Sequence, residues 1–205
     1  MNRVIHAAVR RDLARLASAL GAARDGDVAR ARQLERAYAN LQRELTLHHE
    51  GEDEFVFPYL ARIGSAPDLL KAMDDEHHAM AAALGETRTA MTAYASSGSA
   101  ADAGRARDSV ARTQAVVERH LAHEENDLEP LIEPHLGTAE WKTVEKQLRP
   151  RSPAVAGRFL AWIQDGMTEE GRTYLRSTIP PPVIVVLGRV GGRSYHRDIA
   201  PTWQR

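Results

Sequence analysis

The stretch HHEGEDEFVFP at residues 48–58 is repeated in altered form as HLAHEENDLEP at residues 120–130. Both copies read His-x3-Glu-acid-x4-Pro, and the offset between them is 72 residues (120 − 48). A further histidine precedes each copy, His6 before the first and His77 before the second, at an offset of 71 residues (77 − 6). The chain therefore carries one ordered set twice, a histidine followed by His-x3-Glu, which indicates a duplicated pair of helices.

The His-x3-Glu spacing places both side chains on one face of an α-helix, one turn apart, so that both can face one metal centre. We expect six residues to bind two neighbouring ions: His6 and His48 on one ion, His77 and His120 on the other, with Glu52 and Glu124 bridging the pair. Bridging carboxylates offset the repulsion between two close cations. Two glutamates turned into a bundle without a cation would lose their hydration uncompensated, which argues against a purely structural set.

Several residues beside the predicted ligands carry side chains that also bind metals. His49 and His78 each directly follow a predicted ligand, about 100° further round the helix, and we expect them to face solvent or to support the ligands from outside. His123 lies three residues after a predicted ligand and is the best reserve ligand. Asp53 and Glu125 follow the two predicted glutamates and could replace them, although five residues from the histidine is a poorer helical match than four. The sequence leaves open whether these last three bind metal.

Composition narrows the choice of function. The chain of 205 residues has 27 Lys+Arg against 28 Asp+Glu, so it has no general attraction for nucleic acid or for an anionic membrane. It has no cysteine, which excludes disulfides, thiolate metal sites, iron–sulfur clusters and a thiol nucleophile. Nitrogen and oxygen must hold any metal, which leaves iron, manganese and zinc. No apolar run approaches the roughly 20 residues of a membrane span, so we expect a soluble, cytoplasmic protein with neither nucleic acid nor membrane as partner.

Apolar residues at helical spacing predict four long helices in the first two thirds of the chain. We expect them over about residues 4–24, 27–58, 65–97 and 101–132, with Ser65 as the N-cap of the third. Short connections favour antiparallel neighbours, so residues 1–136 are predicted to form an all-α, up-down-up-down four-helix bundle that carries the metal site.

The composition changes after Gly137. Residues 137–205 hold 11 Lys+Arg against 6 Asp+Glu, which makes this part basic. Ser152-Pro153, Thr168 and the prolines at 180–182 are typical of helix starts, and Gly191-Gly192 of a stop. We expect residues 137–205 to be an extension of short helices that packs on the bundle through apolar side chains such as Trp162.

The pattern of residues 1 to about 135 resembles the hemerythrin-like, or HHE cation-binding, family. The matching positions are His6, His48-x3-Glu52 with Phe57-Pro58, Glu76-His77, and His120-x3-Glu124-Glu125. The resemblance implies a four-helix bundle with two non-haem irons joined by an oxo or hydroxo bridge. It also implies a role in binding or sensing O2, in turning over nitric oxide or peroxide, or in handling iron. The end of the chain is similar to extensions of actinobacterial hemerythrin-like proteins.

One departure from the family bears on the chemistry. The oxygen-carrying hemerythrins use five histidines, two of them one turn apart on the third helix, whereas Met73 and Ala81 stand one turn either side of His77 here. With four histidines, the ion of His77 and His120 should keep an exchangeable position. We therefore expect an oxidoreductase that reacts with O2, peroxide or nitric oxide and takes electrons from a donor that the sequence does not identify. A non-catalytic iron-binding, iron-donating or O2-sensing protein needs the same six ligands and is the alternative.

Two further alternatives are weaker. A ferritin-like site needs Glu-x-x-His on two helices and two more glutamates, but Leu45 and Val117 stand three residues before His48 and His120. A metal-free helical interaction module would leave the repeated ligand set unexplained.

Overall fold

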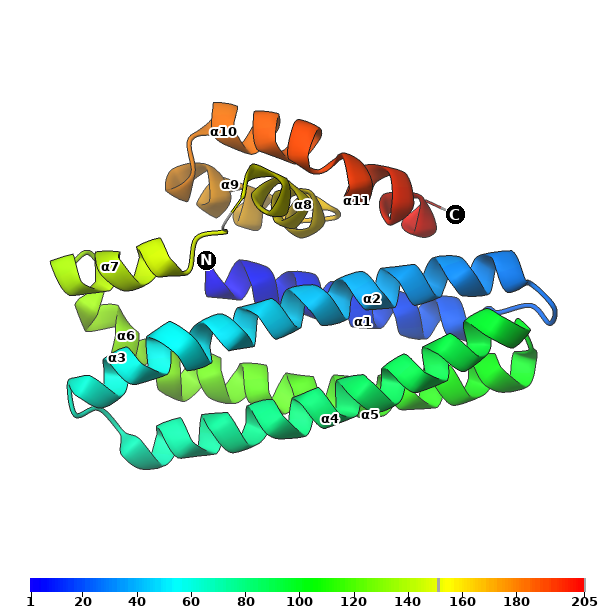
Figure 1. The fold of residues 1–205 in the computed structure, drawn as a ribbon, viewed down its shortest axis with the longest axis horizontal. Coiled ribbons are helices and arrows are strands. Elements are labelled where there is room, and N and C mark those ends of the chain that lie inside the picture. The colour runs from blue at the N-terminus through cyan, green and yellow to red at the C-terminus, as the bar shows by residue number, and fades with distance from the viewer. Residues whose placement is uncertain (151, 205) are drawn as a thin grey trace.

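A computed structural model describes residues 1–150 and 152–204, which form helices and turns without a strand. The bundle consists of α1 (Asn2–Gly21), α2 (Val28–Gly51), α4 (Pro67–Ser97) and α5 (Ala100–His123). Two of these continue past a π-helical turn: α2 through η1 (Glu52–Val56) into α3 (Phe57–Arg62), and α5 through η2 (Glu124–Leu128) into α6 (Glu129–Ile132). The helices of the bundle lie side by side along the long axis, with α1 and α4 each packed against both α2 and α5 (Figure 1). The predicted all-α bundle with C-terminal helices is confirmed.

Local sequence sets most helix ends where they were expected. The Asp27 side chain caps α2 by accepting from the backbone N of Arg30 at 2.9 Å. Gly98 ends α4 with φ +64°, and a Cβ there would lie 2.8 Å from Cγ2 of Val28, so glycine serves both the backbone angle and the packing. The predicted N-cap of the third helix was wrong: α4 starts at Pro67 after Ala66, which is left-handed (φ 40°) and makes no side-chain cap.

The C-terminal helices cover one side of the bundle, most of them as a layer over α1 and α2 and the first of them at the bundle end near α3 and α6 (Figure 1). They are α7 (Ala139–Gln147), α8 (Pro153–Gln164), α9 (Glu169–Thr178), α10 (Pro181–Val186) with the π-helical turn η4 (Leu187–Gly191), α11 (Arg193–Asp198) and the 3-10 turn η5 (Ala200–Trp203). Ser152 and Thr168 cap α8 and α9 as predicted, and the helix that ends at Gly191 stops where the glycine pair indicated.

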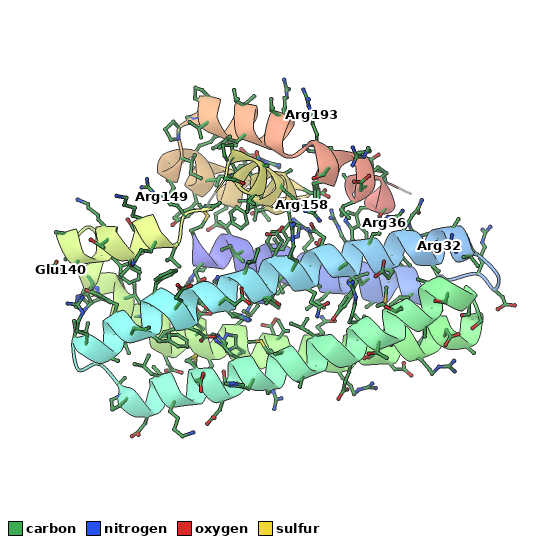
Figure 2. The ribbon with its side chains drawn as sticks, viewed as in Figure 1. Arg32, Arg36, Glu140, Arg149, Arg158 and Arg193 are labelled. Carbon is green, nitrogen blue, oxygen red and sulfur yellow. The ribbon has the colours of Figure 1, made fainter. Side chains whose placement is uncertain are left out.

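The extension shares its apolar core with the bundle. Leu160, Ala161, Trp162 and Ile163 of α8 belong to the same buried cluster as the inner residues of α1, α2, α4 and α5. Polar contacts orient this packing. Trp162 is fully buried and donates from Nε1 to Oδ2 of Asp12 at 2.8 Å. Arg158 lies between the extension and α2 (Figure 2), where it donates to Oδ1 of Asn40 at 3.0 and 3.1 Å.

Two glycines allow α8 and η4 to touch. A Cβ at Gly157 would lie 2.3 Å from the carbonyl O of Leu187 and 2.4 Å from Cα of Gly191. Because backbone atoms cannot yield as a side chain can, only glycine fits at position 157.

A second, smaller apolar cluster joins α7 to the bundle end, where Trp141 packs edge-on against Tyr59.

None of the helices in the described part of the chain is long and apolar enough to cross a lipid bilayer.

Candidate metal centre

Each copy of the repeated stretch breaks the α-helix in the same way. Glu52 begins η1 and Glu124 begins η2, and each accepts a hydrogen bond at its carbonyl O from a backbone N five residues later instead of four. Each π turn ends two residues before the repeated proline, Pro58 after η1 and Pro130 after η2. Proline has no N–H to donate in a regular helical hydrogen bond. Such single π turns are frequent at functional sites, because the extra residue changes where the following side chains point.

The six residues predicted as ligands lie together inside the bundle. Five of them are buried, and the sixth, His48, has a side chain that is 10% exposed. The Nε2 atom of His6 lies 3.2 Å from Nε2 of His48 and 3.2 Å from Oε2 of Glu124. The two repeats thus meet at one point, although whether the six side chains bind metal stays a prediction.

Each glutamate lies between histidines assigned to different ions. Glu52 has Oε1 3.4 Å from Nε2 of His48 and Oε2 3.7 Å from Nε2 of His77. Glu124 has Oε2 3.2 Å from Nε2 of His6 and 3.8 Å from Nε2 of His120. This is the arrangement that two bridging carboxylates require.

The outer nitrogens of three of these histidines face carboxylates. Nδ1 lies 2.8 Å from Glu125 in His6, 2.7 Å from Asp53 in His77 and 3.0 Å from Glu76 in His120. A carboxylate accepts a proton-bearing nitrogen, so the Nδ1–H tautomer is favoured and the inner Nε2 keeps its lone pair for a metal. Asp53 and Glu125 therefore orient imidazoles in this structure and do not take the places of Glu52 and Glu124.

His123, the reserve ligand, lies outside the cluster. Its Nδ1 is 2.8 Å from Oε1 of Glu76 and its Nε2 3.6 Å from Asp127, and the side chain is 31% exposed. It shares the Glu76 carboxylate with His120. His123, at the end of α5, therefore points toward Glu76 of α4 near the surface and away from the six predicted ligands.

Two roles were expected for His49, facing solvent or supporting the ligands, and the first is wrong because the side chain lies inside the bundle. Its residue is only 6% exposed, and its ring stacks on His77 with centroids 4.3 Å apart and planes at 22°. It meets His120 edge-on at 5.1 Å. One ligand atom each of His49, His77 and His120 all lie within 4.8 Å of one another. His78, by contrast, has a 78% exposed side chain, as expected.

A signal for His49 was present in the sequence. The apolar stripe of α2 runs through Leu34, Tyr38, Leu41 and Leu45, all fully buried. A step of three from Leu45 reaches residue 48 and a step of four reaches residue 49, so the buried stripe passes between both histidines. Residues 48 and 49 therefore flank the inner face of α2, although their side chains are about 100° apart around the helix.

Five inward atoms lack a hydrogen-bond partner although they are buried: Nε2 of His49, His77 and His120, and Oε2 of Glu52 and Glu124. Buried polar atoms are rarely left without partners, because each one costs about 1–3 kcal/mol. Imidazole nitrogens and carboxylate oxygens are the donors that iron, zinc and manganese take. The residues therefore fit a bound cation pair.

Burial also shifts the protonation of the site. It raises the pKa of Glu52 well above its usual range, an effect that the neighbouring Glu124 increases. Burial lowers the pKa of His48 to about 3, so this imidazole is neutral at pH 7 and able to bind metal. For Glu124, burial acts to raise the pKa, but the close imidazole of His6 outweighs it and lowers the pKa, which keeps the carboxylate ionised.

The third helix of the bundle, α4, contributes one imidazole to the buried cluster, that of His77, as expected. Met73 is fully buried in the apolar cluster at the bundle end, and Ala81 is exposed. The fifth imidazole of the cluster comes instead from α2.

Comparison with protein families identifies a domain in this chain. The model of the hemerythrin HHE cation-binding domain matches residues 3–132. This range contains the six predicted ligands and His49, and it ends before α7. Neither the curated proteins nor the solved structures that were compared match the chain.

Proposed function

The chain belongs to the hemerythrin family of HHE cation-binding domains, and from this premise we propose that it is a non-haem di-iron protein that reacts with small oxidants, namely O2, peroxide or nitric oxide. One observation carries the proposal: Glu52 and Glu124 each lie between a histidine of one predicted ion and a histidine of the other. A single-ion site would not require two shared carboxylates.

The roles of the residues follow from the geometry. His6 and His48 would hold one iron, His77 and His120 the other, and Glu52 and Glu124 both. When bound, two neighbouring irons supply redox chemistry in which electrons are shared between them. The protein holds the imidazoles in one tautomer through Asp53, Glu76 and Glu125, and its apolar helices exclude bulk water and large molecules from the buried site.

Iron donation, the alternative function, fits the geometry less well. A donor needs a labile site, whereas five of the six predicted ligands are buried. Three of the histidines are also held from outside by carboxylates, and such support typically strengthens metal binding 10- to 100-fold. These features favour an iron pair that stays with the protein.

Absorption spectroscopy with metal analysis tests the proposal. Protein purified in air should carry about two irons per chain and show charge-transfer absorption that changes with peroxide or nitric oxide. Glu52→Ala should lose this absorption, whereas His78→Ala, which alters an exposed histidine, should keep it. Two irons with a spectrum indifferent to both reagents, but bleached by a mild chelator, would favour donation. Wild type that binds neither iron nor another divalent metal would refute the metal centre.

A further inference from the structure

We propose that His49 is a metal ligand, the third imidazole on the ion that His77 and His120 bind. The inference rests on the proposed metal pair and extends it to a residue outside the repeated ligand set. His49, His77 and His120 come from three different helices, α2, α4 and α5, and their ligand atoms lie within 4.8 Å of one another.

The state of the His49 ring supports ligation over a structural role. Its Nε2 is buried and has no hydrogen-bond partner. A core histidine without a metal would be expected to have that nitrogen paired, because an unpaired buried nitrogen costs about 1–3 kcal/mol. The Nε2 atoms of His77 and His120 are in the same condition, and a single cation among the three would satisfy them all.

His49 also shares a second possible group with His48 and Glu52. The stacking of its ring on His77, at 4.3 Å, places it on the side of the His77 and His120 ion, whereas its ring lies 5.3 Å from that of His48. Glu52 belongs to both sides because it bridges. The five imidazoles therefore divide into two, His6 and His48, and three, His49, His77 and His120.

With this assignment, the exchangeable position lies on the ion of His6 and His48. With three imidazoles on the second ion, the ion of His6 and His48 has fewer protein donors and is the one left open to a small ligand. Asn2 lies one turn before His6 on α1, and its Nδ2 donates to Oε1 of Glu124 at 2.5 Å. The sequence alone had indicated the opposite ion.

Cobalt binding to the metal-free full chain tests the proposal. The variants are His49→Ala and His49→Gln, and the control is His78→Ala, which likewise removes a histidine next to a predicted ligand. Wild type and control should bind two Co²⁺ per chain. Both His49 variants should keep one tight ion and bind the second at least about 10-fold more weakly. Their cobalt forms should also show one fewer paramagnetically shifted imidazole N–H resonance than wild type.

His49→Leu separates ligation from a structural role. Leucine removes the unpaired nitrogen at similar volume, so the metal-free variant should melt no lower than metal-free wild type. Its rise in melting temperature on adding Co²⁺ should be smaller than that of wild type. A structural histidine would give the reverse, a lower metal-free melting temperature with an unchanged cobalt effect.

The cobalt results separate failure of the His49 assignment from failure of the metal pair. If wild type binds two Co²⁺ and the His49 variants bind them equally well with the same number of shifted resonances, His49 is not a ligand and the metal pair stands. If wild type itself binds fewer than two ions, the metal pair fails, and the assignment of His49 fails with it.

Discussion

Nδ1 of His77 lies 2.7 Å from Oδ1 of Asp53, the residue directly after Glu52, whose own carboxylate faces the other nitrogen of the same ring. The second repeat has the same relationship. His6 lies between Glu124 on its Nε2 side and Glu125 on its Nδ1 side, at 3.2 and 2.8 Å. In each repeat, consecutive acids therefore enclose one imidazole from another helix, the first on the metal side and the second on the outer side.

Removing the outer acids should weaken metal binding without removing a ligand. We expect Asp53→Asn and Glu125→Gln each to lower the affinity for Co²⁺ or Fe²⁺ about 10- to 100-fold, since the imidazole loses its orienting acceptor. Competition with a chelator of known affinity measures this. Glu54→Gln, at an exposed position next to Asp53, is the matched control and should bind like wild type. Equal affinities in all four proteins would show that these acids are incidental.

Metal removal should destabilise the bundle. The unpartnered Nε2 and Oε2 atoms at the centre lose the cations that would satisfy them, so the metal-free protein should melt at a lower temperature than the loaded protein at pH 7. Calorimetry on samples with verified metal content measures the difference. Coincident transitions would indicate that the site adds nothing to the stability of the fold.

Acid should destabilise the metal-free protein partly through His48. Burial lowers the pKa of His48 to about 3 in the folded chain, while the unfolded chain takes up this proton near pH 6.5. The unfolded state therefore binds more protons between pH 6.5 and 3, and stability is lost through this window as the pH falls, by about 1.4 kcal/mol per pH unit. On moving from pH 7.5 to 5, metal-free wild type should lose about 2 kcal/mol more than metal-free His48→Gln. Urea titrations at both pH values decide this, and parallel losses would contradict it.

The contact between α8 and η4 should tolerate no side chain at position 157. Gly157→Ala places a methyl group against the backbone of Leu187 and Gly191, and we expect it to cost about 1–3 kcal/mol of unfolding free energy. Gly104→Ala is the control, because that glycine lies within α5 with nothing within 4 Å of an added Cβ, and it should be neutral or stabilising by up to about 1 kcal/mol. Denaturant unfolding compares them. Equal effects would mean that the two helices separate at little cost.

The reduced iron-loaded protein should be oxidised rapidly by O2, without a long-lived oxygenated form, and should consume peroxide or nitric oxide. The physical reason is the exchangeable position left where protein donors are fewest. Stopped-flow absorption follows the oxidation, and electrodes follow the other two reagents. Ala81→His should leave these rates unchanged, since residue 81 is exposed and a histidine there faces solvent. Reversible O2 binding that persists for hours would contradict this prediction.

The periodicity and the repeat in the sequence were enough to predict the four helices, their order and the six residues that meet inside the bundle. These features are local: helical spacing sets which residues share a face, and capping residues such as Asp27 set where a helix begins. The start of α4 at Pro67 was not predicted, because the left-handed Ala66 before it belongs to a tight turn between two packed helices and carries no side-chain signal.

Only the tertiary structure decided the roles of the residues beside the predicted ligands. His49 and His78 each follow a predicted ligand by one position, yet His49 lies inside against His77 and His120 while His78 faces solvent. Asp53, Glu76 and Glu125 became hydrogen-bond acceptors because neighbouring helices bring the outer nitrogens of His77, His120 and His6 to them. A helix determines the angle between its own side chains, but the positions of the other helices determine which of those angles point inward.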